Sequence, residues 1–215
     1  MMQMLKFDCI ESTQLYLAER LREGSLNAPI VVVADTQSGG VGSRGNVWES
    51  VQEGLYFSLA IPLSMLPQDL MVESMSIYMS YLFKEVLSQN GAQVWLKWPN
   101  DLYVGDKKVG GVICTKIEEN IVVGIGLNLK VSSIRFGAVE VGIKKDEILE
   151  AFVEILENAK KKFSWKQIFS KYELEFPKNF SYGFHHKGRI VEMSEAVLCD
   201  DGAILIGNEK IYSLR

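Results

Sequence analysis

The sequence contains few of the features that mark export, membrane insertion or nucleic-acid binding. Its longest apolar runs, residues 30–34 and 59–63, are far shorter than the roughly 20 residues that span a bilayer. No basic segment precedes an apolar one after Met1, so neither a secretion signal nor a membrane anchor is predicted. A formal net charge of −4 argues against a general affinity for nucleic acid.

Cysteine and histidine are also scarce. The three cysteines, Cys9, Cys114 and Cys199, are isolated and odd in number, which predicts reduced thiols in a cytoplasmic protein and no disulfide or zinc framework. The two histidines, His185 and His186, are adjacent and therefore point in different directions, which makes them a poor metal-binding pair. No set of metal ligands is assigned from the sequence.

Apolar residues make up 47% of the 215 positions, which is enough for a real core in one domain with a small appendage. The patterning predicts helices over residues 12–23, 67–90 and 146–163, and a short helix after the capping box of Ser164 and Gln167. It predicts strands over residues 30–34, 55–61, 94–98, 102–104, 108–117 and 121–129, and short strands over 188–193, 196–198, 203–206 and 210–214. Residues 35–50 and 131–142 are predicted to be irregular. We therefore expect an α+β body at residues 1–178 and a small β module at residues 179–215.

The segment from Ala34 to Trp48 has the composition of a ligand-binding loop. Four glycines lie within residues 39–45, and they expose backbone N–H groups that can surround an anion. Arg44 adds a forked cation suited to phosphate or carboxylate, and Trp48 adds a flat face on which a ring can stack. The spacing matches neither a Walker A loop nor the dinucleotide-binding GxGxxG motif. A flexible surface loop is the alternative interpretation.

Two lysines mark a second unusual segment. Lys97 lies in an apolar strand between Leu96 and Trp98, where an ammonium group is costly without an anionic partner. The alternative is that its aliphatic stem crosses the apolar surface and carries the charge to solvent. Lys108 follows a turn and precedes two glycines, which would let a ligand approach the backbone closely.

Five blocks of the sequence occur in an order that is typical of one enzyme family. They are Glu11-Ser12-Thr13-Gln14, residues 37–48, Lys97-Trp98-Pro99-Asn100-Asp101, Lys108-Val109-Gly110-Gly111 and Gly124-Ile125-Gly126-Leu127-Asn128. Together they resemble the biotin protein ligases, or biotin–[acetyl-CoA-carboxylase] ligases, and residues 179–215 resemble the SH3-like tail of such enzymes. The resemblance implies an α+β catalytic domain of the class II synthetase-like, biotin–lipoate ligase type. Its sheet would be mixed and largely antiparallel.

The resemblance also implies a two-step reaction with ATP and biotin as substrates. Biotin and MgATP would form biotinyl-5′-AMP and pyrophosphate, and a lysine of a biotin carboxyl carrier protein, an acetyl-CoA carboxylase subunit, would then receive the biotin. No enzyme nucleophile is needed, so the site has to supply positioning and positive charge. Relatives of this kind often form homodimers, which makes a homodimer possible here.

Roles in the family transfer to matching positions of this sequence. Biotin would contact Ser12, Thr13, Gln37, Gly40, Lys108, Gly110 and Gly111. The nucleotide or adenylate would contact Gly42, Arg44, Gly45, Trp48, Lys97, Asn100 and Asn128. The catalytic residues would be Lys97, Arg44, Asp101 and Lys108. Asp101 would orient or deprotonate the incoming lysine, and the alternative for it is a turn-capping aspartate after Pro-Asn.

Two departures from the family pattern bear on activity. Val41 and Ser43 stand where many relatives have arginine, and Gln14 stands where asparagine is usual. We expect the lost positive charge to weaken retention of the adenylate.

Only ten residues precede the first block, so the N-terminal DNA-binding domain of some relatives is not predicted. Two other functions stay open, namely lipoate or octanoate ligation or transfer and a biotin-binding module that has lost catalysis.

Overall fold

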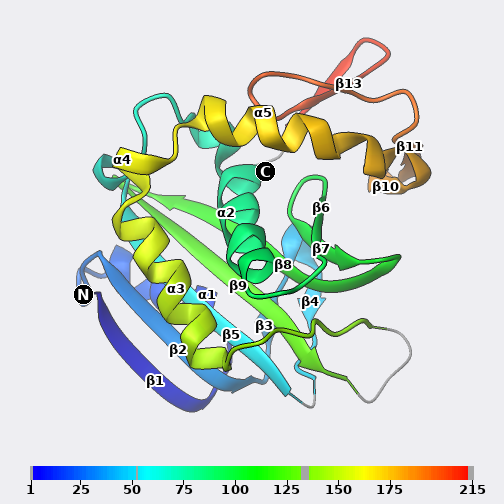
Figure 1. The fold of residues 1–215 in the computed structure, drawn as a ribbon. Coiled ribbons are helices and arrows are strands. Elements are labelled where there is room, and N and C mark those ends of the chain that lie inside the picture. The colour runs from blue at the N-terminus through cyan, green and yellow to red at the C-terminus, as the bar shows by residue number, and fades with distance from the viewer. Residues whose placement is uncertain (1, 52, 132–135, 213–215) are drawn as a thin grey trace.

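The computed structural model of the protein describes residues 2–51, 53–131 and 136–212. A seven-stranded sheet in the order β1-β2-β5-β9-β8-β7-β6 forms its centre (Figure 1). The strands are β1 (Gln3–Ile10), β2 (Ile30–Gln37), β5 (Glu53–Pro62), β6 (Trp95–Lys97), β7 (Asp101–Val104), β8 (Lys107–Ile117) and β9 (Asn120–Lys130). β1 and β2 run parallel and the other neighbouring pairs run antiparallel, which confirms the predicted mixed, largely antiparallel sheet.

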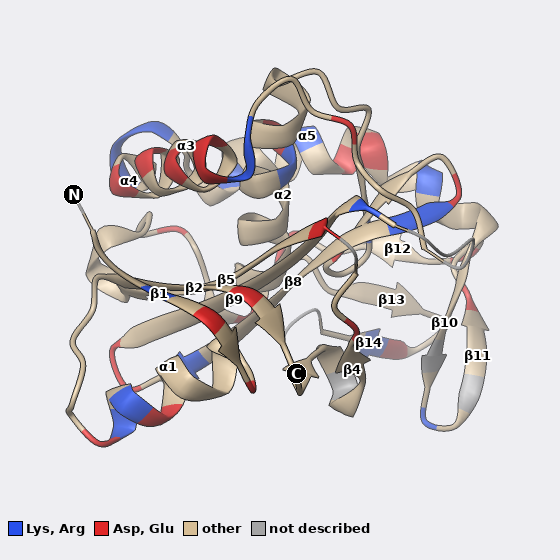
Figure 2. Ribbon diagram, turned by 90° about the horizontal axis from the view of Figure 1, so that it is seen from below, with Lys and Arg blue, Asp and Glu red and all other residues tan. Residues whose placement is uncertain are grey.

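Helices cover both faces of this sheet (Figure 2). α1 (Thr13–Arg22) lies on one face, where Leu17 and Ala18 pack with Val32, Ala60 and Val122. α2 (Met75–Gln89) and α3 (Lys145–Glu157) cover the opposite face, and α5 (Trp165–Glu175) packs against α2. No helix in the described ranges is long and apolar enough to cross a membrane.

The core on the second face is built around three aromatic rings. Phe57 of β5, Phe83 of α2 and Phe152 of α3 meet edge to face, with centroids 5.1 to 6.1 Å apart. All three side chains are fully buried. Because such rings combine a large buried area with a favourable edge-to-face geometry, they tie the two helices firmly to the sheet that carries the site.

The C-terminal strands form two small antiparallel sheets. β10 (Gly183–His186) pairs with β11 (Arg189–Glu192), and β13 (Ile204–Ile206) pairs with both β12 (Val197–Leu198) and β14 (Glu209–Ile211). They follow the 3₁₀ helix η4 (Phe176–Ser181), and such a set of short strands is consistent with an SH3-like module. The sequence did not predict β10. A domain boundary between residues 178 and 179 stays a prediction.

Three consecutive backbone carbonyls attach the C-terminal strands to the rest of the chain. The carbonyls of Asp200, Asp201 and Gly202 accept hydrogen bonds from Trp165 Nε1 (2.8 Å), from the Ser74 hydroxyl (2.8 Å) and from Trp98 Nε1 (2.9 Å), respectively. Gly202 has a φ of +80°, a conformation that side-chain-bearing residues rarely adopt. The turn therefore contacts the segment that continues into Asn100 and Asp101.

Two long helices predicted from the sequence are shorter in the structure. The predicted helix at 67–90 begins only at Met75, after the short 3₁₀ turns η2 (Leu63–Met65) and η3 (Val72–Ser74). The loop before it presents Asp69, whose two carboxylate oxygens accept from the N–H groups of Trp165 (3.0 Å) and Lys166 (3.1 Å). Asp69 thus caps the start of α5 from a distant part of the chain.

The predicted helix at 146–163 is divided, and the edge strand β1 is a further element that was not predicted. α3 ends before Asn158, whose side chain bonds to the Glu154 carbonyl (2.9 Å), and α4 (Ala159–Lys162) follows. β1 was not predicted because Lys6 and Asp8 interrupt its apolar residues, and the strand is only partly buried at the edge of the sheet.

Candidate active site

The candidate site lies on the part of the sheet that α1 leaves uncovered. Alternate residues of a strand share a face, so Gly124 and Gly126 face the same way as Val122, which packs with α1. Gly111 pairs with Gly126 on the next strand. Beyond the N-terminus of α1, the sheet therefore carries glycines in place of apolar side chains. This leaves a pocket over the glycines.

A short ribbon covers the glycines. β3 (Gly40–Val41) pairs with β4 (Val47–Trp48), and the 3₁₀ turn η1 (Ser43–Gly45) joins them, so part of the segment predicted to be irregular is regular. The Trp48 indole lies directly on Gly126, where an added Cβ would be only 2.4 Å from Trp48 Cε2. A Cβ at Gly111 would be 3.4 Å from the same ring system. The glycines of β8 and β9 thus leave the space that the Trp48 indole occupies.

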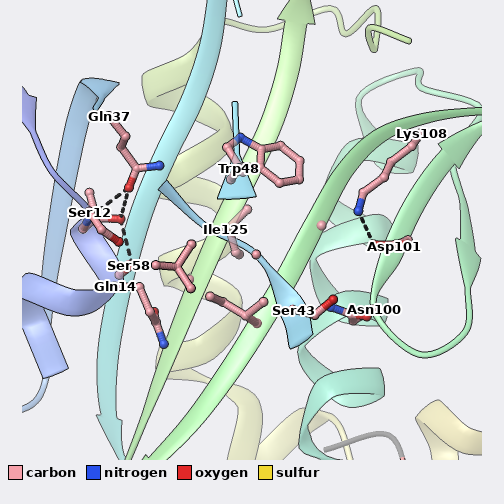
Figure 3. Close-up of a pocket in the computed structure, with 17 residues that line it drawn as sticks. Ser12, Gln14, Gln37, Ser43, Trp48, Ser58, Asn100, Asp101, Lys108 and Ile125 are labelled. Carbon is pink, nitrogen blue, oxygen red and sulfur yellow. Dashed lines mark hydrogen bonds and ion pairs between the residues drawn. The ribbon is translucent and has the colours of Figure 1, made fainter. Parts of the chain in front are cut away.

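One end of the pocket is polar and its hydrogen bonds have a defined direction (Figure 3). Gln37 Oε1 accepts from the Thr13 N–H (2.9 Å) and from the Thr13 hydroxyl (3.1 Å). The Thr13 hydroxyl has one proton, so in its contact with Ser58 Oγ (2.9 Å) Ser58 must donate. The Gln37 amide nitrogen points into the pocket (Figure 3). Because Ser58 donates in its contact with Thr13, its oxygen can still accept a hydrogen bond. This end therefore offers both a donor and acceptors to a ligand.

The opposite end carries charge. Lys108 Nζ lies 2.6 Å from Asp101 Oδ1 and 5.4 Å from the centre of the Trp48 ring. The Asn100 amide donates to the Val112 carbonyl (2.7 Å), and the Asn100 carbonyl accepts from the Val112 N–H (2.9 Å). These two bonds hold the turn before β7 against β8, and so place Asp101 beside Lys108.

A second pocket adjoins the first one. Trp48 and Lys108 line both pockets, and the second is also lined by Asn46, Val47, Glu49, Asn128 and Phe136, with an empty volume of about 890 Å³. The Asn128 amide donates to the Gly137 carbonyl (3.1 Å), whereas its buried Oδ1 lacks a partner among the described atoms. One cation and one ring thus line both cavities.

Lys97 has a different environment from the one that its apolar strand suggested. It pairs with Asp101 across β6 and β7, and its ammonium lies 5.2 Å from the ring centres of both Tyr103 and Tyr182. Burial, together with the nearby Asp101 carboxylate, raises the pKa of Tyr103 to about 12, so this ring stays neutral. Lys97 therefore lies beside the charged end of the pocket but does not line it.

The structure brings together most of the residues predicted for the site. The pocket is lined by Ser12, Thr13, Gln37, Gly42, Trp48, Asn100, Asp101, Lys108 and Gly111. Asn128 lines the second pocket, whereas Gly40, Gly45, Lys97 and Gly110 line neither. Arg44 is part of η1, and its side chain lies outside the described part of the structure.

Several lining residues were not among the site residues predicted from the sequence. They are Gln14, Val41, Ser43, Ser58, Ile113, Gly124, Ile125 and Gly126. Three of them had a usable signal. Ser58 is a single hydroxyl inside an apolar strand, and Gly124 and Gly126 alternate at the spacing that places both on one face.

The comparison with known proteins comes from sequence and from structure. Residues 6–132 match the biotin/lipoate A/B protein ligase family. The chain belongs to this family. The chain is also similar to the bifunctional ligase/repressor BirA of Escherichia coli K12, to which it is 33% identical over 140 residues, or 62% of this chain and 42% of BirA. The chain thus spans about two fifths of the length of BirA.

Two solved structures extend the family likeness over nearly the whole chain. A biotin acetyl coenzyme A carboxylase synthetase from Helicobacter pylori, solved with bound biotinylated ATP, is 41% identical with a TM-score of 0.94, and the match covers 99% of this chain and 100% of that one. A biotin protein ligase from Aquifex aeolicus, in complex with biotin and ATP, is 25% identical with a TM-score of 0.73, covering 99% and 96%. The family and fold predicted from the five sequence blocks are therefore confirmed.

Proposed function

We propose that this chain activates biotin with ATP and transfers it to a lysine of a biotin carboxyl carrier protein. The observation that carries the proposal is the pair of adjoining pockets that share Trp48 and Lys108. One pocket ends in amide and hydroxyl groups that match the donors and acceptors of a cyclic urea. The relatives solved with biotinylated ATP or with biotin and ATP support this assignment.

In the proposed first step, the biotin carboxylate attacks the α-phosphate of ATP, which forms biotinyl-5′-AMP and releases pyrophosphate. Two anions must meet, so a cation at their meeting point lowers the barrier. Lys108 has this position because it lines both pockets. Arg44 and Lys97 would add positive charge as the loop closes and as Lys97 leaves the rings of Tyr103 and Tyr182. Mg²⁺ would enter with ATP, held mainly by phosphate oxygens and water.

In the proposed second step, the amine of the carrier lysine attacks the acyl carbon and AMP leaves. The amine must be neutral to attack, so a nearby carboxylate that orients it and accepts its proton would help. Asp101 is suited to this role because it lines the pocket and bonds to Lys108, the cation next to the reacting bond.

The carrier protein is the proposed partner, and a homodimer remains a prediction of the family resemblance. We also propose a cytoplasmic location, which the three free cysteines support because thiols stay reduced in that compartment.

Exchange of labelled pyrophosphate into ATP, with biotin or lipoate as the acid, tests the function. We expect exchange with biotin and not with lipoate. Lys108→Ala should lower the rate about 100-fold or more with unchanged circular dichroism, because it removes the cation shared by both pockets. Lys107→Ala is the matched control, since Lys107 is exposed and lines neither pocket. Exchange with lipoate alone would assign a lipoate ligase, and biotin binding without exchange would leave a binding module.

A further inference from the structure

β6 is an edge strand of the central sheet, and α5 and η4 pack along this edge. An edge strand presents N–H groups that point away from its neighbour in the sheet. Here two such groups are bonded by side chains. The Leu96 N–H donates to Glu175 Oε1 (2.7 Å), and the Trp98 N–H donates to Asn179 Oδ1 (2.7 Å). Lys97 lies between the two, so its backbone is held on both sides from outside the sheet.

Asn179 is fully buried and its amide has one orientation. Nδ2 donates to the Phe176 carbonyl (2.9 Å), which can only accept, so the amide oxygen is the atom that faces Trp98. The main-chain carbonyl of Asn179 also accepts from the Tyr182 N–H (2.9 Å), and the Tyr182 ring centre lies 5.2 Å from the Lys97 ammonium. Asn179 thus holds both the backbone next to Lys97 and a ring that Lys97 contacts.

Glu175 is fixed by an ion pair with α2. Its Oε2 lies 3.0 Å from Lys84 Nζ, and only 11% of the Glu175 side chain and 9% of the Lys84 side chain are exposed. Burial acts to lower the pKa of Lys84, but the charge and hydrogen bond of Glu175, with smaller contributions from Tyr81 and Glu85, raise it overall. Lys84 therefore stays charged and holds one carboxylate oxygen, while the other accepts from Leu96.

The placement of Lys97 matters because its ammonium lies beside the charged end of the pocket, where Lys97 pairs with Asp101 across β6 and β7. With the backbone held on both sides, the ammonium reaches a ligand by rotation about its side-chain bonds alone. The starting point of that rotation is set by the two anchoring bonds. A misplacement of about 1 Å near reacting groups can cost a factor of about 100 in rate.

We propose that Asn179 and Glu175 are positioning residues for the adenylation step and act through Lys97. The inference rests on the proposed function. The described residues that line the two pockets include neither Asn179 nor Glu175. Their loss should therefore slow the reaction without weakening biotin binding.

A double-mutant cycle on pyrophosphate exchange, at saturating biotin and ATP, tests the link to Lys97. Asn179→Ala should lower the exchange rate about 10- to 100-fold, while biotin affinity by calorimetry stays within about twofold of the wild type. Added to Lys97→Ala, the same change should cause little further loss, because both substitutions act on one ammonium. Fully additive losses would overturn the proposal, and so would wild-type exchange in Lys97→Ala.

Asn158→Ala is the matched control. The Asn158 side chain also donates to a carbonyl of its own helix, that of Glu154 (2.9 Å), but it lines neither pocket. This variant should exchange pyrophosphate like the wild type.

Two substitutions of Glu175 separate positioning from stability. Glu175→Gln keeps an oxygen that can accept from Leu96, whereas Glu175→Met does not, and both remove the charge next to Lys84. Both should lower the Tm, but only Glu175→Met should lower the exchange rate, by about tenfold or more. Equal exchange rates in the two variants would reject the positioning role and leave Glu175 as a structural partner of Lys84.

The Glu175 pair takes the place of Asn179→Ala in the cycle if that variant does not fold. A wild-type protein without biotin-dependent exchange would reject the proposed function. An active wild type whose folded Asn179→Ala variant exchanges equally fast would reject the positioning role alone, so the two failures are distinguishable.

Discussion

The contact between Trp48 and Gly126 predicts that one added methyl group will weaken ATP binding. In Gly126→Ala, the new Cβ would lie 2.4 Å from Trp48 Cε2 and 2.7 Å from Cζ2. Carbon atoms pack favourably at about 3.5 to 4.0 Å, so the indole would have to move by roughly 1 Å. The pairing of Trp48 with Gly40 across β3 and β4 restricts this movement.

The magnitude follows from the known cost of overpacking. Inserting a methyl group into a tightly packed position costs about 1–3 kcal/mol. If the cost falls on the arrangement in which Trp48 lines both pockets, ATP affinity should fall about 5- to 150-fold, because about 1.4 kcal/mol corresponds to a factor of ten. Biotin affinity should fall less, since the polar end of its pocket does not depend on the indole.

Calorimetry with ATP checks this prediction. Gly142→Ala is the control, because the nearest atom to its added Cβ is the Asn90 carbonyl oxygen at 3.6 Å, an ordinary contact. Combining Gly126→Ala with Trp48→Phe should restore part of the affinity, since a smaller ring fits above the new methyl group. If Gly126→Ala binds ATP as tightly as Gly142→Ala does, the indole does not define the nucleotide pocket and the reasoning is refuted.

Three further predictions concern the loop, the thiols and the C-terminal strands. Ser43→Arg should slow the release of labelled biotinyl-5′-AMP, because it adds a cation to the loop over the pocket; equal off-rates would contradict this. Alkylation at pH 8 should modify the exposed Cys9 and spare Cys114, whose pKa burial raises to about 12, as peptide mapping would reveal. Hydrogen bonds, first from Lys187, lower the pKa of Glu209 from 4.5 to about 2. The folded-state pKa is depressed, so this contact stabilises fully above pH 4.5 and is lost as the pH falls towards 2. Glu209→Gln should flatten the pH dependence of thermal unfolding over that interval.

Local sequence patterns predicted most of the fold and one end of the site. The capping box of Ser164 and Gln167 is present in the structure, because both partners lie within one turn. Asp101 and Lys108 meet because a short hairpin joins them, which the turn between them already indicated. Such features depend on residues close in sequence, so their geometry can be derived from spacing alone.

The remaining features depend on contacts between distant segments. The Asp69 cap joins residues almost a hundred positions apart, and no pattern within residues 67–90 indicates it. The ring of Tyr182 next to Lys97 comes from beyond the last helix, so no pattern around Lys97 in the sequence indicated this contact. The orientation of Gln14 likewise requires Thr115 and Val122 from two other strands.

The turn at residues 200–202, whose carbonyls accept hydrogen bonds from the rest of the chain, has a consequence for sequence variation among homologues. Its three acceptors, at residues 200 to 202, are main-chain carbonyls, so replacing the side chain of Asp200 would leave the corresponding bond intact. Gly202 is different, because an added Cβ would lie 2.8 Å from Ile77 and the backbone there has positive φ. Homologous chains could therefore vary at the first position of this turn while keeping the same attachment, provided that the third remains glycine.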